Sequence, residues 1–261
     1  MSVAPMPVST PLPAALAGRT VLVIGGSSGI GLAAGELLRS LGARVVLVAR
    51  DKARLNAAVA HCLAVPGATH DDPVLGIAAD AGDERELDRV FEQAGPIDHV
   101  LVTAGGFQVG PLDATPRADV QDAVDSRLWG AYAVARAAAP RLPAGGSITF
   151  TSGLYATRPL PGMAAAVAAI GAVEALTKAL AVELAPRRVR VNAVRYGVFD
   201  TPLARGALGA ATDEAVAEAG RAFLPGRLGT PAEAAAAPIF LMSDNYVSGA
   251  VIPVDGGQSL V

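Results

Sequence analysis

The chain has 261 residues, of which 52% are hydrophobic and 17% are charged, and its formal net charge is −3. This length fits one large α/β domain better than two small ones, and the hydrophobic fraction argues against intrinsic disorder. The weak negative charge argues against a nucleic-acid partner or an anionic membrane surface, and the single cysteine, Cys62, excludes an internal disulfide.

The N-terminal segment, residues 1–16, is rich in proline and small residues and has no basic region of the kind that begins a signal peptide. We therefore predict a flexible tail ahead of a single domain that covers 17–261. The longest apolar run, 163–173, is too short to cross a bilayer and is followed by Glu174. Together with the lone cysteine, which fits a reducing compartment, these features predict a cytoplasmic protein outside the membrane.

The first predicted strand, 22–24, runs directly into a glycine-rich turn, and a predicted helix, 32–41, follows it. Such a turn lets backbone N–H groups approach a diphosphate, and the helix N-terminus adds partial positive charge. The residues predicted to bind a nucleotide here are Gly25, Ser27, Ser28, Gly29, Ile30 and Gly31. A glycine-rich loop without a ligand is the alternative interpretation.

Further apolar strands alternate with helices along the rest of the chain. The other six strands are predicted at 44–49, 74–79, 99–103, 148–151, 189–194 and 251–254. Helices are predicted between them, at 54–63, 84–93, 120–139, 164–184 and 232–242. Continuous apolar strands separated by helices indicate a parallel sheet with both faces covered. The predicted fold is α/β, a single doubly wound Rossmann-type domain with about seven strands and a ligand site at their carboxyl ends.

The second strand ends at Ala49-Arg50-Asp51, about 20 residues past the glycines, where the adenosine ribose of a dinucleotide is expected. An acidic residue at the strand end would accept the ribose hydroxyls of NAD, but Ala49 has no such group. Arg50 instead favours the 2′-phosphate of NADP. We expect NADP(H), with NAD(H) and a merely solvated Arg50 as alternatives, and we expect Asp51 to cap the next helix.

With these motifs the chain resembles the short-chain dehydrogenase/reductase family, from about residue 18 to residue 261. The glycine turn is similar to the family's cofactor loop, and Thr103-Ala-Gly105 is similar to the second half of its Asn-Asn-Ala-Gly motif. Val254-Asp-Gly-Gly257 resembles the family's closing signature. The resemblance implies that the cofactor also contacts Asp80, Ala81, Ala104, Gly105, Gly197 and Thr201.

The resemblance also implies a catalytic tetrad, and the sequence lacks it. In the family a Tyr transfers the proton, a Lys four residues later lowers the Tyr pKa, and a Ser and an Asn complete the site. The register set by 172–178 and 180–186 places Ala166 at the Tyr position and Ile170 at the Lys position. Gly153 falls at the Ser position and Arg127 at the Asn position.

Tyr155, which follows the fifth strand, is the candidate substitute acid, and Arg127 would assist it if the guanidinium approached the phenol. The alternative is that Tyr155 is an aromatic wall of the pocket. The remaining residues predicted to line a substrate pocket are Phe107, Gln108, Arg127 and Tyr196. Glu174, one turn past Ile170, is expected to be a solvated or interface charge, with a position facing the site as the alternative. No spacing of Cys, His or paired carboxylates indicates a metal, and His99 begins a strand at the end opposite the cofactor.

Three functions are compatible with this combination. The first is an NADP(H)-dependent oxidoreductase with slow or atypical hydride transfer between carbonyl and alcohol; the second is a catalytically silent cofactor sensor or partner subunit. The third is a non-redox lyase or cyclase whose pocket binds an anion or an enol. Each implies a small-molecule ligand. The resemblance implies a homodimer or homotetramer that uses helices 120–139 and 164–184, and residues 201–224 are predicted to form a mobile lid over the substrate.

Overall fold

Seven strands form one parallel sheet in the computed structural model, which describes residues 13–66, 74–106 and 108–261. Their order is β3-β2-β1-β4-β5-β6-β7. The strands are β1 Thr20–Ile24, β2 Arg44–Ala49, β3 Leu75–Ala78, β4 His99–Val102, β5 Ser147–Gly153, β6 Arg190–Tyr196 and β7 Val251–Val254. The strand order reverses between β1 and β4, and in such sheets the ligand crevice lies at the carboxyl ends of these strands. The predicted Rossmann-type α/β fold is confirmed.

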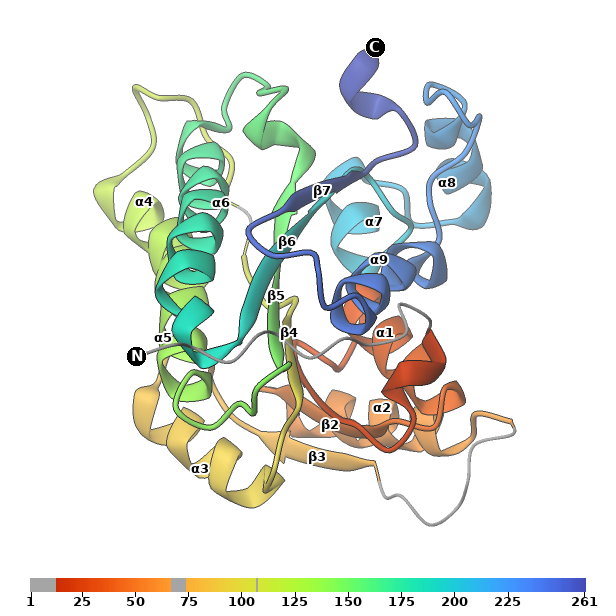
Figure 1. The fold of residues 1–261 in the computed structure, drawn as a ribbon. Coiled ribbons are helices and arrows are strands. Elements are labelled where there is room, and N and C mark those ends of the chain that lie inside the picture. The colour runs from red at the N-terminus through yellow and green to blue at the C-terminus, as the bar shows by residue number, and fades with distance from the viewer. Residues whose placement is uncertain (1–12, 67–73, 107) are drawn as a thin grey trace.

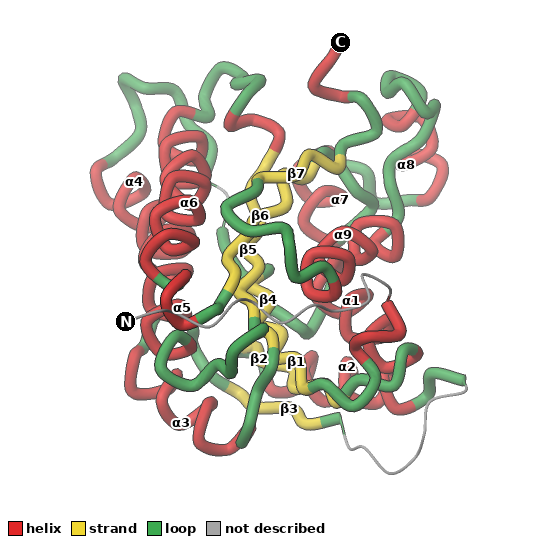
Figure 2. The backbone as a smooth tube through the Cα atoms, in the orientation of Figure 1, coloured by secondary structure: helices red, strands yellow, loops and turns green. Residues whose placement is uncertain are grey.

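Helices cover both faces of the sheet (Figure 1). One face carries α1 Gly29–Ser40, α2 Lys52–Leu63 and α9 Pro231–Ser243. The other carries α3 Glu84–Ala94, α4 Arg117–Val124, α5 Gly130–Ala138 and α6 Ala164–Glu183. Figure 2 shows the strands running between these two groups, with α7 Pro202–Leu208 and α8 Asp213–Gly220 beyond the end of β6.

The strands are mainly apolar because both of their faces are buried, although β5 and β6 also carry buried polar residues such as Ser147 and Asn192. In β1, Leu22 and Ile24 pack in the core under α3 to α6, whereas Val21 and Val23 pack in the core under α1, α2 and α9. This double burial holds the end of β1 in place from both sides. The glycine turn that follows is therefore attached to a rigid element.

The predicted helix 120–139 contains a local widening. It consists of α4, a π-helical turn at Asp125–Trp129 and α5. A π-turn places one more residue in a helical turn than the α-helix does and is frequent at functional sites. Here the π-turn carries Arg127 at its centre.

The predicted N-terminal tail is ordered in its last residues. Pro13–Leu16 forms a 3-10 helix, and Leu16 is buried in the core under α1 and α9. The rest of that prediction, 1–12, lies outside the described residues.

α6 is the one helix in the described chain that is long and apolar enough to cross a membrane, judged by length and composition alone. A single such helix is weak evidence for a membrane protein, because core helices have the same composition. Ala166 and Ile170 of α6 are buried, yet only 33% of its most apolar window is buried, and Val182 is exposed.

Candidate active site

The turn after β1 depends on glycine at two positions. Gly25 has a φ of +91°, and a Cβ there would lie 2.6 Å from the backbone nitrogen of Ala104. A Cβ on Gly31 would overlap the carbonyl oxygen of Gly25. A side chain at either position would push the turn away from β4 or from α1, so the glycines set its tight shape.

α1 begins with an open N-terminus. Ser28 is the N-cap residue, but its side chain caps no backbone N–H of the described helix. The bond from Leu32 N to Ser28 O starts the helical ladder, which leaves the N–H groups of Gly29, Ile30 and Gly31 without helical partners. Exposed N–H groups and the helix dipole together favour a phosphate, so the turn fits the diphosphate of a dinucleotide.

Thr103 secures this turn from the neighbouring strand. Its hydroxyl donates to the carbonyl oxygens of Ile24 at 3.0 Å and Gly25 at 3.2 Å. The sequence interpretation used Thr103 only as part of a motif and gave it no contact. Thr103 directly follows β4, which is the neighbour of β1 in the sheet, and this position is the sequence signal from which its contact with the turn could have been predicted.

The expected adenosine end lies at the carboxyl ends of β2 and β3. The side chain of Arg50 is 81% exposed and lies 4.0 Å from Asp80, whose other carboxylate oxygen accepts a bond from Gly82 N. Asp51 caps α2 as expected, by accepting a bond from Arg54 N at 3.0 Å. The guanidinium of Arg50 is thus open to a 2′-phosphate.

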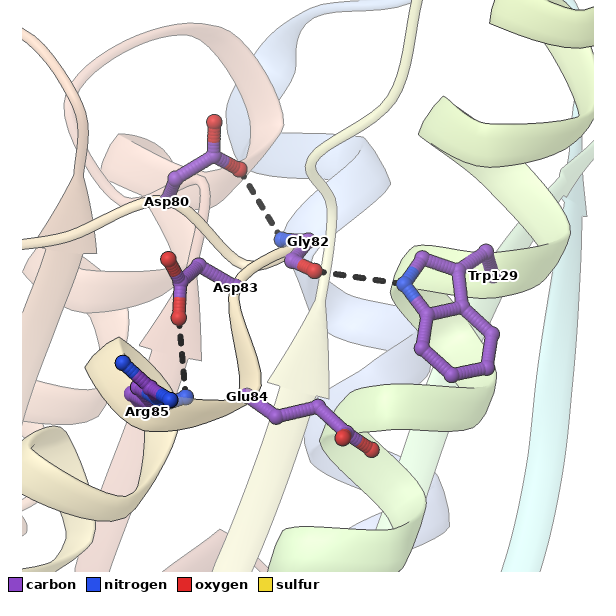
Figure 3. Close-up of a pocket in the computed structure, with 6 residues that line it drawn as sticks. All are labelled: Asp80, Gly82, Asp83, Glu84, Arg85 and Trp129. Carbon is purple, nitrogen blue, oxygen red and sulfur yellow. Dashed lines mark hydrogen bonds between the residues drawn. The ribbon is translucent and has the colours of Figure 1, made fainter.

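An open hollow of about 550 Å³ adjoins Asp80 (Figure 3). Trp129, from the π-turn, forms the far side of the hollow, and its indole N–H donates to Gly82 O at 3.2 Å. Ala81 is half-buried against the core under α3 to α6. Trp129 is therefore in a position to report by fluorescence on a nucleotide at Asp80.

The structure brings Thr201 and Gly197 to the same end of the sheet as the glycine turn. A Cβ on Gly29 would lie 3.4 Å from Cγ2 of Thr201, whose hydroxyl caps α7. Gly197 packs on the C-terminal segment, where a Cβ would lie 2.8 Å from Cα of Asp255. The predicted lid segment, 201–224, therefore starts next to the glycine turn.

The positions assigned to the Tyr, Lys and Ser of the tetrad hold no proton-transferring group. Ala166 is 3% exposed and Ile170 is 2% exposed. A Cβ on Gly153, at the end of β5, would lie 3.5 Å from Cδ1 of Ile170, so these two positions are adjacent in space. An apolar surface thus occupies the place where the family resemblance implies the proton-transfer groups.

Arg127, at the position assigned to the Asn of the tetrad, lies across the glycines that follow β4. Its Nε donates to the carbonyl oxygen of Gly106 at 2.9 Å, and a Cβ on Gly105 would lie 2.6 Å from its Cδ and Nε. Desolvation lowers the pKa of Arg127. The guanidinium of Arg127 is thus held on the glycine backbone through its Nε.

Glu174 is not the solvated charge that the sequence predicted. It accepts a bond from Ser152 at 2.6 Å and two bonds from Arg195 at 2.8 and 2.6 Å. Burial alone would raise the pKa of Glu174, but the hydrogen bonds from Arg195 and Ser152 hold it below its ordinary value. The ionised carboxylate therefore ties α6 to β5 and β6.

The residues predicted to line the substrate pocket have different environments. Tyr155 is half-buried on the 3-10 turn Leu154–Ala156 after β5. Gln108 is half-buried in the loop after β4, and Phe107 lies outside the described residues.

The prediction that Tyr196 borders the pocket is wrong. Tyr196 is 6% exposed, donates to Ala234 O at 2.8 Å and packs edge-on against Phe199. Burial raises the pKa of Tyr196. β6 continues through this residue, so the alternation of the strand turns the phenol towards α9.

The other titratable groups of interest lie away from the site. His99 is buried at the start of β4 beside Ser147, and burial lowers its pKa to about 3. Burial raises the pKa of the Cys62 thiol to about 12. Within 13–66, 74–106 and 108–261, no group of His, Cys, Asp and Glu residues could hold a metal ion.

Comparison with known proteins agrees with this geometry. The family model described as enoyl-(acyl carrier protein) reductase matches residues 24–259. The short-chain dehydrogenase/reductase ATR9 of Stachybotrys chlorohalonatus is 36% identical over 255 residues, which cover 93% of this chain and 98% of that protein. Carbonyl reductase family member 4 of Danio rerio is 32% identical and covers 93% of this chain and 99% of its own.

Two solved structures are similar over nearly the whole chain. An NADPH-bound short chain oxidoreductase from Pseudomonas aeruginosa, described as containing an atypical catalytic center, has a TM-score of 0.85 and 32% identity over 92% of this chain and 96% of that one. The MalC reductase/Diels-Alderase from Malbranchea aurantiaca has a TM-score of 0.86 and 29% identity, over 94% of this chain and 98% of that one. The chain therefore belongs to the short-chain dehydrogenase/reductase family of oxidoreductases.

Proposed function

We propose that this protein is an NADP(H)-dependent oxidoreductase that interconverts a small carbonyl compound and an alcohol slowly, with a proton donor outside the family tetrad. The observation that carries the proposal is the glycine turn: its amides at the start of α1 have no cap, and Thr103 braces it. NADPH bound to the relative from Pseudomonas aeruginosa supports the same cofactor class.

Different residues of this chain would bind different parts of the cofactor. The N–H groups of Gly29 to Gly31 would hold the diphosphate, and Arg50 would hold the 2′-phosphate at the end of β2. When bound, the nicotinamide supplies the hydride, while the protein orients the reacting groups. Thr201 and Gly197 would position the nicotinamide end, and the proximity of Thr201 to Gly29 supports this role.

Proton transfer would fall to Tyr155 or to water. Without a neighbouring ammonium that would help to ionise it, a phenol donates a proton more readily than it accepts one. Loss of a positioned general acid or base costs about 10²–10⁴-fold in rate. Slow turnover, better for reduction than for oxidation, is expected, and a Tyr155→Phe variant with unchanged turnover would leave water as the donor.

Cofactor choice is tested by binding, which needs no turnover. Quenching of Trp129 fluorescence would give dissociation constants for NADPH and NADH, and NADPH at 100-fold excess over its Kd should stabilise the protein by about 2.7 kcal/mol. Arg50→Ala should weaken NADPH about 10-fold and leave NADH unchanged, because it removes one exposed charge-assisted contact. The matched control is Arg54→Ala, which removes an exposed arginine from the first turn of α2. Equal effects of Arg50→Ala on both cofactors would remove the preference for NADP.

A second function, a silent cofactor sensor or partner subunit, is favoured by Gly153 and Ile170, which lie next to each other and carry no proton-transferring group. NADPH oxidation across a panel of carbonyl compounds separates the two functions. Tight NADPH binding with no oxidation above the protein-free rate would favour the sensor.

We also propose a cytoplasmic homodimer or homotetramer that binds neither nucleic acid nor membrane. Exposed apolar side chains on the π-turn, α5 and α6 support this, since Trp129 and Tyr132 stack at 6.0 Å with 38% and 45% exposure and Val182 is 77% exposed. Burial of such surface between copies would be favourable. Light scattering after size-exclusion chromatography tests it, and a monomer at micromolar concentration would refute it.

A further inference from the structure

The surroundings of Arg127 differ from those of two other arginines at this end of the sheet, which pair with carboxylates. Arg195 pairs with Glu174, and Arg205 pairs with Asp200. Among the described residues, Arg127 makes one hydrogen bond, to Gly106 O, and desolvation acts on it without an offsetting charge. A half-buried guanidinium without a counterion is unfavourable, unless a ligand brings the negative charge.

The bond to Gly106 also fixes how the guanidinium is presented. Nε is used by the backbone, and the side chain lies against Gly105, where a Cβ would overlap it. The two terminal nitrogens then remain as a planar fork held in one orientation. Such a fork matches the two oxygens of a carboxylate, each of which can accept one N–H.

Arg127 lies between the glycine turn and the positions assigned to the Tyr, Lys and Ser of the tetrad. Gly105 follows β4, whose neighbours in the sheet are β1, which carries the glycine turn, and β5, which ends at Gly153. Gly25 is close enough to Ala104 that a Cβ would touch its nitrogen. A molecule held by Arg127 would therefore lie over the end of β4, between the strand that leads into the glycine turn and the strand that leads to Tyr155.

We propose that Arg127 binds a carboxylate group of the substrate, so that the protein selects small carbonyl compounds that carry an acid group, such as 2-oxo acids. The choice of carbonyl compounds rests on the proposed function, whereas carboxylate binding does not. The ion pair between Arg127 and the substrate carboxylate would orient the substrate, a role that the Ser and Tyr of the tetrad would otherwise share.

Binding is tested with oxamate and oxamide, which have nearly the same size but differ by one negative charge. Each is titrated against the full chain saturated with NADP⁺, with thermal shift and Trp129 fluorescence as the signals. We expect oxamate to bind at least 10-fold more tightly than oxamide, and Arg127→Gln to remove the difference. Arg127→Lys keeps the charge without the fork and should retain part of the difference. Arg136→Gln, on the exposed side of α5, is the matched control, and circular dichroism verifies that each variant folds.

Two results would overturn the proposal. One is equal binding of oxamate and oxamide, or no binding of either, to a folded protein that binds NADP⁺. The other is an Arg127→Gln variant that loses NADPH affinity, without any oxamate, by as much as it loses oxamate affinity, because the guanidinium would then serve a cofactor phosphate.

Turnover separates this proposal from the proposed function. Phenylglyoxylate and its methyl ester are compared as substrates of NADPH oxidation, and Arg127→Gln should raise the KM of the acid roughly 10- to 100-fold while leaving that of the ester nearly unchanged. If oxamate binds through Arg127 but neither ketone is reduced, carboxylate binding stands and the reductase proposal fails. If the ester is reduced as well as the acid and oxamate has no advantage, the reductase stands and the carboxylate anchor fails.

Discussion

Restoration of the missing proton-transfer pair is the most direct test of why this site would be slow. Ala166→Tyr and Ile170→Lys would place a phenol and an amine one helical turn apart on α6. Both positions are at most 3% exposed, so each new side chain must displace packed neighbours. Overpacking costs about 1–3 kcal/mol for a larger core side chain, and a buried ammonium adds a desolvation cost. We expect the double variant to be about 2–4 kcal/mol less stable than the parent but still folded, given the typical stability of domains of this size.

The expected gain is in turnover. A positioned general acid contributes about 10²–10⁴-fold, so NADPH oxidation with an activated ketone should rise by at least 100-fold in the double variant. Neither single variant should give this rise, because the amine acts by lowering the pKa of the phenol. Gly153→Ser can be added on top, since a Cβ there meets Ile170 only at ordinary contact distance, 3.5 Å.

Ile170→Met is the control, because it preserves the apolar volume and should cost less than about 1.5 kcal/mol without any change in rate. Urea unfolding and NADPH binding must be measured on every variant before its rate is interpreted. A double variant that folds and binds NADPH, yet turns over no faster than the parent, would show that the absent Tyr and Lys are not what limits the reaction.

Three further predictions concern side chains that hold the site together. Glu174→Gln should destabilise the protein by about 2 kcal/mol in urea unfolding, because it leaves the partly buried Arg195 without its counterion. In the parent protein, the pKa of Glu174 is lowered by folding, so the stability that it contributes is present at neutral pH and is lost as the pH falls through its folded pKa; stability that is flat on acidification would contradict this. Thr103→Val should weaken NADPH binding about 5-fold and cost about 1 kcal/mol of stability, since the turn loses the hydroxyl proton that Ile24 O and Gly25 O share. Tyr196→Phe should cost about 1 kcal/mol of stability and leave turnover unchanged, whereas a fall in turnover would mean that the phenol reaches the substrate.

The sheet could be predicted from sequence because its signal is local. Each strand is a short apolar run, and the run at 22–24 leads into glycines that only a tight turn requires. The π-turn at Asp125–Trp129 could not be predicted in this way, since one added residue in a helical turn barely changes the apolar pattern of the helix. Its consequence, an arginine side chain lying flat on two glycines, depends on that local geometry.

Errors arose where the partner of a side chain lies far away in sequence. The bonds from Arg195 and Ser152 to Glu174 join three elements, and no spacing within α6 indicates them. Tyr196 was misplaced for a related reason: β6 was predicted to end at 194, but it runs to Tyr196. A strand that continues for two residues puts 196 on the same face as Val194, and both side chains belong to the core under α9.

In the proposed function, cofactor binding and proton transfer would depend on different parts of this chain, so one could change without the other. The proposed diphosphate site consists of backbone: glycines that permit the turn, and N–H groups at the start of α1 that the side chain of Ser28 does not cap. Proton transfer in the family depends instead on side chains of α6 that project towards the end of β5. The positions assigned to those side chains hold the buried Ala166 and Ile170, whereas the glycines of the turn 25–31 pack against Thr103, Ala104 and Leu47. Selection for cofactor binding would therefore preserve the turn even if side chains on α6 changed. Carboxylate binding by Arg127 would then let the pocket keep a substrate without the Tyr and Lys of the tetrad.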